Sequence, residues 1–490
     1  MSNDPVRPTR RPAATPAAPR VVVVGAGIAG LAAATAVRRE RPDVEVVVLE
    51  AAAQVGGKLR LGQVAGVTVD LGAESILHRR PEGVDLARSA GLGDRVVHPA
   101  TTEARIWSRG SLHRMPRSVM GVPADVAELA SSGVVSRKGQ ARASMDLVLP
   151  ATRLDGDDVS VGWLIEQRLG REVLDRLVEP LLGGVYAGHA REISARAAVP
   201  QVVALLDHDT SLMRAVGAAL EGPASTAPVF AGLVGGVGQL ATTLAKALDV
   251  RTGSTVRDLA RTSTGWQVVT GSVPSPELVE ADAVVVAVPA GPASRLLADV
   301  APGAALELAT IEYASMAVVT LAFRAVDMPA VEGSGFLVPP VEGRHAKAAT
   351  WSFAKWGWVR EEGRRAGDVV LLRASVGRHR DEQELQVTDE ELVARVLADL
   401  GDAVGLDAQP VDAVVTRWGG GLPQYAVGHL DRVRSIREHV GRLPGLAVCG
   451  AAYDGLGIPA CIASAELAAH QVIDALPTTG GIGRVRFEGE

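Results

Sequence analysis

Three glycines and one carboxylate near the start of the chain have the spacing needed to bind a dinucleotide. Gly25, Gly27 and Gly30 follow four consecutive valines and precede a segment rich in Ala and Leu. This order predicts a buried parallel strand, a tight turn and a helix whose N-terminus faces a pyrophosphate. Glu50 ends the next apolar run, about 20 residues after Gly30, where a carboxylate accepts a ribose hydroxyl. A glycine turn without a ligand is the alternative, and Glu50 argues against it.

The residues after Glu50 distinguish between NAD and FAD, which share this fingerprint. Residues 56–58, Gly-Gly-Lys, follow at the distance at which large flavoprotein oxidases carry a Gly-Gly pair and a basic residue. Near the other end of the chain, a short apolar strand at 446–450 precedes residues 455–459, which open a predicted helix. The positive end of that helix would stabilise negative charge on a reduced flavin. The sequence therefore favours FAD.

Composition limits the classes of function. The chain has 490 residues, of which 47% are hydrophobic, so we expect a globular protein of two or three domains. A net charge of −6 argues against general nucleic-acid binding. Two cysteines, Cys449 and Cys461, are too few for a disulfide framework and fit a reducing cytoplasm. No metal-ligand cluster is visible, and the longest apolar run, 21–37, is too short to cross a membrane.

The order of the predicted elements indicates an α/β (α+β mixed) chain with a discontinuous Rossmann-like domain. We predict an FAD-binding domain made of residues 20–75, 228–300 and 436–476, because apolar strand patterns return in these ranges. Apolar residues with helical period between 161 and 181 predict a mostly helical lobe. The remaining predicted parts are a disordered tail at 1–19, a substrate-binding domain at 76–94 with 301–435, the helical lobe at 95–227, and a tail at 477–490.

Two local clusters each allow two interpretations. A basic hairpin predicted over 104–116, turned at Arg109 and Gly110, has either a solvated face or a contact with a ligand or partner. Aromatic residues make up only 3% of the chain, yet four of them fall within eight residues: Trp351, Phe353, Trp356 and Trp358. These four either pack in a core or form one wall of a pocket for a wide, flat, apolar substrate, with Lys355 among the rings.

Further motifs resemble those of a known family. Residues 183–188, followed by 191–194, and residues 455–462 resemble the glycine-rich segment and the C-terminal flavin signature of the FAD-dependent protoporphyrinogen and coproporphyrinogen oxidases of haem biosynthesis. Motifs at 112–117, 139–146, 350–352, 416–418, 423–425 and 427–429 are similar to the Gram-positive bacterial branch. Two departures are Ala460, where the family commonly has Asp, and a longer N-terminal tail.

The resemblance implies a fold of monoamine-oxidase type, with a mixed-sheet substrate domain beside the FAD-binding domain. It also implies noncovalent FAD, because neither cysteine lies in the covalent-attachment pattern of amine oxidases. The implied contacts with FAD are Gly25, Ala26, Gly27, Ile28, Ala29, Gly30, Glu50, Ala51, Lys58, Gly72, Ala73, Glu74, Ser75, Val256, Trp418, Gly457, Ile458 and Pro459.

The activity implied by the resemblance is the oxygen-dependent oxidation of coproporphyrinogen III to coproporphyrin III in coproporphyrin-dependent haem biosynthesis. This removes six electrons, so three O2 would become three H2O2. A protoporphyrinogen IX oxidase and a non-catalytic flavin or porphyrin carrier are the alternatives. No catalytic residue is identified, and positioning of the substrate would supply most of the acceleration.

Substrate carboxylates need cationic partners, and placement suggests three of them. Arg79 and Arg80 follow a predicted flavin loop, and Lys355 lies in the aromatic cluster, so we predict that they bind propionates. A solvated surface role is the alternative for each. The expected partners are coproporphyrinogen III, molecular oxygen and, transiently, the next enzyme of the haem pathway. A cytoplasmic location is expected, with peripheral membrane contact left open.

Overall fold

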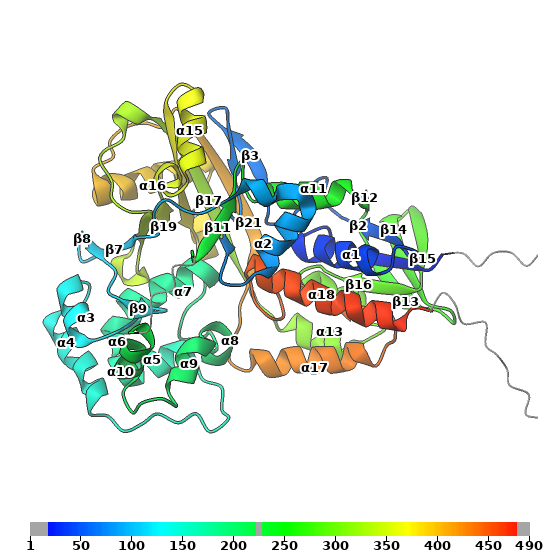
Figure 1. Ribbon diagram of the computed structural model, residues 1–490, viewed down its shortest axis with the longest axis horizontal. Helices are drawn as coiled ribbons and strands as arrows, with labels where there is room; N and C mark the ends of the chain where they lie inside the picture. The colour runs from blue at the N-terminus through cyan, green and yellow to red at the C-terminus, as the bar shows by residue number, and fades with distance from the viewer. Residues whose placement is uncertain (1–17, 222–227, 478–490) are drawn as a thin grey trace, which may run out of the picture.

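The computed structural model describes residues 18–221 and 228–477. The predicted tails, 1–19 and 477–490, lie outside the described residues apart from residues 18, 19 and 477. Three parts are visible in Figure 1: a sheet covered by long helices on the right, a second sheet at the upper left, and a group of short helices at the lower left. No helix within the described ranges is long and apolar enough to cross a membrane.

The first part is built on a five-stranded parallel sheet with strand order β12-β2-β1-β16-β22. The N-terminal strand lies at its centre, since Val22 pairs with Val47 on one side and with Val284 on the other. Strands buried on both faces favour runs of β-branched residues, which explains the valines. The predicted Rossmann-like sheet is confirmed. Its strands are β1 (Arg20–Val24), β2 (Glu45–Leu49), β12 (Asp249–Arg251), β16 (Ala283–Val286) and β22 (Leu446–Val448).

Helices cover both faces of this nucleotide sheet. One face packs against α1 (Ile28–Glu40), α2 (Glu82–Ala87), α11 (Gly238–Lys246) and α18 (Ile458–Ala475). The other face packs against an antiparallel sheet of β13 (Asp258–Arg261), β14 (Trp266–Ser272) and β15 (Ser275–Ala281), and against α12 (Ala290–Leu297), α13 (Pro302–Ala309) and α17 (His429–Gly441).

Two of these helices lie in a different part of the molecule from the one predicted. α13 falls within 301–435 and α17 begins there, the range assigned to the substrate-binding domain. Both nevertheless pack on the nucleotide sheet, because apolar side chains such as Leu308 and Ile436 complete the core on its second face. The assignment of these segments by their order along the chain was therefore wrong, because order along the chain does not specify which sheet a segment covers.

The second part is a seven-stranded mixed sheet with strand order β21-β17-β20-β19-β18-β7-β8. The predicted hairpin turned at Arg109 and Gly110 forms its edge, and both turn residues have positive φ. This edge falls within 95–227, the range assigned to the helical lobe, yet β7 pairs with β18 of the sheet. The strands are β7 (Ala104–Ser108), β8 (Ser111–Arg114), β17 (Tyr313–Arg324), β18 (Gly335–Leu337), β19 (Ala346–Thr350), β20 (Val369–Val376) and β21 (Asp412–Pro423).

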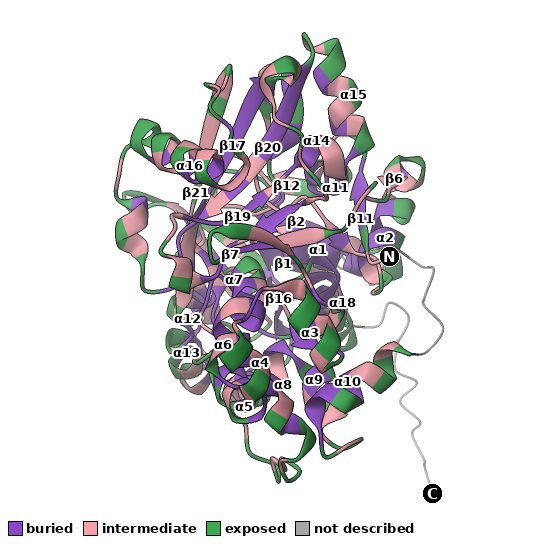
Figure 2. Cartoon of the chain, turned by 90° about the vertical axis from the view of Figure 1, so that its left-hand side faces the viewer, coloured by how far each residue is buried: buried purple, intermediate pink, exposed green. Residues whose placement is uncertain are grey.

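Helices and small hairpins enclose this second sheet. Figure 2 shows its central strands β17 and β20 as buried, with exposed residues concentrated on the outer helices. The helices are α14 (Ser352–Lys355), α15 (Gly357–Arg365) and α16 (Asp389–Val404). Short strands connect it to the nucleotide sheet: β3 (Leu61–Val64), β4 (Val67–Asp70), β5 (Ile76–Leu77), β6 (Val96–Val97) and β11 (Phe230–Leu233).

The third part is helical, as the apolar period between 161 and 181 predicts. Leu164, Ile165 and Leu177 are fully buried in its core. It consists of β9 (Ser118–Val119), β10 (Val122–Pro123), α3 (Val126–Ser132), α4 (Arg137–Ser144), α5 (Val161–Leu169), α6 (Arg171–Val173), α7 (Glu179–Tyr186), α8 (Ala195–Ala198), α9 (Pro200–Leu205) and α10 (Leu212–Leu220).

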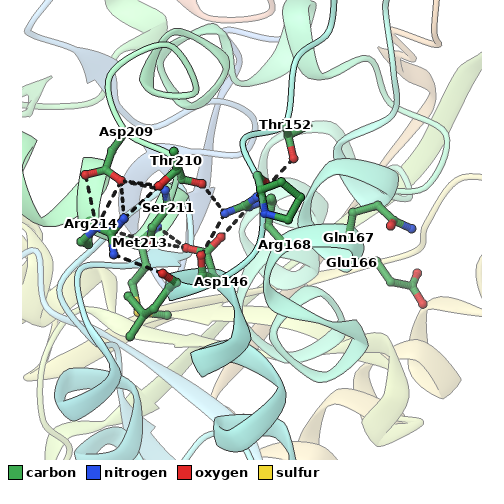
Figure 3. Close-up of polar contacts among 12 residues, drawn as sticks. Asp146, Thr152, Glu166, Gln167, Arg168, Asp209, Thr210, Ser211, Met213 and Arg214 are labelled. Atoms are coloured by element: carbon green, nitrogen blue, oxygen red, sulfur yellow. Dashed lines mark hydrogen bonds and ion pairs between the residues drawn. The ribbon is translucent and has the colours of Figure 1, made fainter.

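A buried ion pair holds this lobe together. Arg168 Nε donates to an Asp146 carboxylate oxygen at 2.5 Å, and the two side chains are 2% and 0% exposed. The other Asp146 oxygen accepts from Ser211 Oγ at 2.6 Å and from the Met213 backbone N–H at 2.8 Å (Figure 3). Asp146 therefore joins the end of α5 to the start of α10.

Candidate cofactor and substrate site

The glycine turn between β1 and α1 has the geometry of a dinucleotide cradle. Gly25 has a φ of +103°, which L side chains rarely adopt, and Gly27 is the N-cap of α1. A Cβ on Gly30 would lie 1.9 Å from the Gly25 carbonyl oxygen, so this position admits no side chain. A Cβ on Gly27 would meet no protein atom within 4 Å, because Gly27 faces a cavity. The first α-helical N–H groups are thus open to a phosphate.

Glu50 is held at the end of β2 by the same turn. Its carboxylate oxygens accept the backbone N–H of Ala26 at 2.7 Å and of Ala52 at 2.8 Å. These two bonds fix the direction of the carboxylate beside the cavity, which Glu50 also lines. A ribose hydroxyl could donate to the lone pairs that remain.

A single cavity of about 910 Å³ runs from this turn to the second sheet. It passes Lys58 and the loop at 72–74, and it ends among strands β17, β19, β20 and β21. The N-terminus of α18 also reaches it through Ile458. The positive end of an 18-residue helix is therefore directed at the cavity. Its size and extended course fit a dinucleotide at one end and a flat ligand at the other.

The cavity brings together most of the residues that the sequence assigns to FAD. Five of the 18 do not line it: Ala26, Gly30, Ser75, Gly457 and Pro459. These five lie in the same turns, next to lining residues. The residues that line it are Gly25, Gly27, Ile28, Ala29, Glu50, Ala51, Lys58, Gly72, Ala73, Glu74, Val256, Trp418 and Ile458.

The three cations assigned to the substrate are not brought to the cavity. Arg79 is exposed and Arg80 pairs with Glu82 at 2.6 Å. Lys355 Nζ donates to Glu74 at 2.7 Å and to Ser75 Oγ at 3.0 Å. None of these three side chains lines the cavity. Lys355 forms its hydrogen bonds inside the protein because the aromatic cluster around it packs into the core.

The aromatic cluster is a core and not a pocket wall. Trp351 and Trp356 are each 2% exposed, and they belong to the apolar cores beneath the second sheet. Phe353 and Trp358 are half-buried against the same cores. Lys355 Nζ lies 5.3 Å from the centroid of the Trp356 ring. The packing interpretation of this cluster is therefore confirmed.

Glu74 forms the strongest electrostatic contacts of the site. Lys355 binds one oxygen of its carboxylate, and Arg373 of β20 donates to the other at 2.9 Å. Arg373 also donates to the carbonyl oxygen of Gly72. Burial acts to raise the pKa of Glu74, but the two cations outweigh it and lower the pKa to about 2. Arg373 lines the cavity from this fixed position.

Arg373 and Arg295 were not found from the sequence. Arg373 could have been noticed as a charged residue inside an otherwise apolar strand, but its partners are distant in sequence. Arg295 of α12 lines the cavity near Val256 and is exposed. The carboxyl end of β16, residues 287–289, lines the same region.

The glycine-rich segment at 183–188 packs as closely as its composition suggests. A Cβ on Gly188 would lie 2.0 Å from Gln424 Oε1, and Gln424 Nε2 donates to the Tyr186 carbonyl oxygen at 2.8 Å. Gly184 and Val185 of the same segment line the cavity. The segment is therefore a wall of the site, locked to the end of β21.

The parallel sheet, the glycine turn and the Glu50 carboxylate beside the cavity are the features of a dinucleotide-binding protein. The chain belongs to the flavin containing amine oxidoreductases, whose family description matches residues 28–473. It is therefore an FAD-dependent oxidoreductase, as its glycines and Lys58 predict.

Individual relatives are similar to this chain over almost its whole length. The coproporphyrinogen III oxidase of Mycobacterium tuberculosis (strain ATCC 25618 / H37Rv) is 39% identical, covering 93% of this chain and 97% of the relative. The coproporphyrinogen III oxidase of Bacillus subtilis (strain 168) is 33% identical, with coverage of 93% and 97%. A crystal structure of a protein from Exiguobacterium sp. 255-15 has a TM-score of 0.82 at 32% identity, covering 93% of this chain and 98% of the other. The resemblance stated from the motifs is confirmed.

Proposed function

We propose that this chain is an oxygen-dependent coproporphyrinogen III oxidase of haem biosynthesis. The observation that supports this most is the full-length similarity to coproporphyrinogen III oxidases at up to 39% identity. The cavity supports it independently, since one continuous space joins the nucleotide turn to a region lined by β17, β19, β20 and β21. Such a space would have room for FAD at the nucleotide turn and for a flat substrate beside the second sheet.

The residues that line the cavity would hold the cofactor. The turn at 25–29 and Glu50 would bind the pyrophosphate and ribose, and Lys58 would lie beside the flavin. Burial lowers the pKa of Lys58, and a nearby anion would act in the opposite direction and favour its charged form. When bound, FAD accepts two electrons at a time and passes them to oxygen. Six-electron oxidation of the substrate then needs three turns and yields three H2O2.

The residues that line the cavity would position the substrate. Met316 and Val318 of β17, with Leu456, present an apolar surface at the substrate end. Such a surface excludes water and orients a flat ring. Arg373, fixed by Glu74 and Gly72, presents a cation on this wall.

Noncovalent attachment of FAD is part of the proposal. Cys461 lines the cavity but is 5% exposed, and burial raises the pKa of its thiol to about 11. Cys449 is fully buried, and burial raises the pKa of its thiol further. Both stay protonated at neutral pH and are weak nucleophiles. Acid precipitation should release all yellow colour into the supernatant; colour retained in the pellet would contradict this.

A parallel assay with coproporphyrinogen III and protoporphyrinogen IX tests the substrate. Product fluorescence and oxygen uptake are followed at two salt concentrations. We expect a higher kcat/KM for coproporphyrinogen, reduced by salt because exposed charge contacts are screened. A higher value for protoporphyrinogen, insensitive to salt, would overturn the assignment. Under anaerobic conditions the substrate should bleach the flavin, which a non-catalytic carrier would not allow.

A further inference from the structure

Two buried cations that form no direct ion pair with a carboxylate of the described residues lie beside residues of the substrate end of the cavity. Lys347 of β19 and Arg378, just after β20, are 2% and 8% exposed. Lys347 Nζ donates to the Gly377 carbonyl oxygen at 3.0 Å, and Arg378 donates to the Val338 carbonyl oxygen at 3.1 Å. Across 18–221 and 228–477, neither forms an ion pair with a carboxylate.

Arg168 differs from these two cations because it forms an ion pair with a carboxylate. Arg168 is equally buried, but Asp146 neutralises it. A buried cation without such a partner is costly, because it has lost water and gained no counter-charge. Burial and the neighbouring Arg378 both lower the pKa of Lys347, to about 7. An anion reaching this place would remove the cost and restore the full charge of the ammonium.

Two irregularities in the sheet place Lys347 there. β19 carries one extra residue at Lys347, since the register against β20 shifts before the pair Ala348 and Ser375. The pairing of β17 with β21 also shifts just before Met316, where the extra residues belong to β21. Bulges redirect side chains and are frequent beside active sites. Here they bring Lys347 Nζ within 3.9 Å of Met316 Sδ.

Lys347 and Arg378 do not themselves line the cavity, but neighbours of Lys347 do. Met316, Ala348 and Ser375 all line it, and so does α7 through Gly184. Met316 thus both lines the cavity and contacts the Lys347 ammonium through its sulfur. Methionine is unbranched and flexible, so it can move without disturbing the strand.

We propose that Lys347, supported by Arg378, binds a carboxylate of the substrate at the end of the cavity formed by β17, β19 and β20. The inference rests on the proposed function, because coproporphyrinogen carries four propionates that need cationic partners. The other cation on this wall, Arg373, already binds Glu74. Among the described residues, Lys347 has only the Gly377 carbonyl oxygen and the Met316 sulfur as polar contacts, and Arg378 is attracted by Glu179, Asp381 and Glu384 without forming an ion pair with them.

Binding of coproporphyrin III, the stable oxidised product, tests this on the FAD-loaded protein. Porphyrin fluorescence is titrated for wild type, Lys347→Met and Lys347→Arg. We expect Lys347→Met to weaken binding roughly tenfold, the loss of a charge-assisted contact, and Lys347→Arg to stay close to wild type. Lys246→Met, at an exposed position of α11, is the matched control and should bind normally. Flavin absorbance and Tm verify that each variant is folded and loaded.

The tetramethyl ester of coproporphyrin III lacks the carboxylate charges, so its binding distinguishes a lost charge contact from a changed cavity shape. Wild type and Lys347→Met should bind this uncharged ester with equal affinity. If the substitution lowers the affinity for ester and acid equally, it altered only the shape of the cavity, and the proposal is overturned. If Lys347→Met does not fold, Arg378→Gln takes its place, with weaker binding of the acid expected. Unchanged binding in these variants, in a wild type that oxidises coproporphyrinogen, overturns the inference alone. A wild type that does not oxidise coproporphyrinogen overturns the proposed function.

Discussion

The Lys355 ammonium lies 2.7 Å from the Glu74 carboxylate, across 281 positions of the sequence. Glu74 belongs to the loop that passes the cofactor cavity, and Lys355 belongs to the short helix beneath the aromatic core. With Arg373 on the other oxygen, this contact fixes the cavity loop to the second sheet. The ion pair therefore positions the two main parts of the molecule relative to each other.

Replacement of Glu74 by Gln should change the pH dependence of stability. The folded pKa of about 2 lies below the ordinary 4.5 of a glutamate, so its stabilisation is present above about pH 4.5 and is lost as the pH falls towards 2. It amounts to something on the order of 3 kcal/mol. Unfolding of Glu74→Gln at pH 7 should therefore occur at lower Tm than wild type, and the gap should narrow in acid. Glu277→Gln, at an exposed position of β15, should show neither effect.

Lys355→Met should lower Tm and leave KM for coproporphyrinogen unchanged, because Lys355 binds Glu74 and does not line the cavity. Arg80→Ala should change stability by less than about 0.5 kcal/mol, since exposed ion pairs contribute little. Steady-state kinetics and thermal unfolding check both variants. A raised KM at unchanged Tm would return Lys355 to the substrate site.

Gly27→Ala should lose affinity for FAD, whereas Gly30→Ala should lose stability. A Cβ on Gly30 collides with the Gly25 carbonyl oxygen, so that variant should lose stability even without cofactor. A Cβ on Gly27 meets only the cavity, so apo Gly27→Ala should unfold at nearly the wild-type Tm. Its affinity for FAD should fall roughly tenfold or more, because the methyl group takes space needed by the ligand. Thermal unfolding of the apoproteins and FAD titration distinguish the two. Equal loss of apo stability would contradict this.

Asp146→Asn should destabilise the helical lobe. The substitution leaves Arg168 buried without a counter-charge, which typically costs about 3–5 kcal/mol. Limited proteolysis should then cut within 126–220 faster than in wild type, before the nucleotide sheet is attacked. Asp209→Asn removes the exposed partner of Arg214 and should have a much smaller effect. Equal protease resistance of wild type and Asp146→Asn would show that the pair is dispensable.

The sequence predicts local features of this molecule well and distant pairings poorly. The glycine turn and Glu50 were predictable because their spacing reflects one ligand and one turn. The partner of Lys355 was not, since an ion pair between Lys355 and Glu74 leaves no local pattern. Aromatic density at 351–358 likewise does not say whether the rings face a core or a cavity. The bulge at Lys347 depends on the register of a neighbouring strand, which no single segment encodes.

The packing of α1 against α18 has a consequence for the order of events during synthesis. α1 ends at Glu40 and α18 ends at Ala475, yet both belong to one core on the same face of the nucleotide sheet. A growing chain therefore carries the apolar face of its first helix uncovered until α18 has been translated. Residues 450–452 and the N-terminus of α18, which line the cofactor cavity, also follow the rest of the site along the chain. The cavity is therefore complete only once this helix has formed, and the exposed apolar surface of a shorter nascent chain favours aggregation.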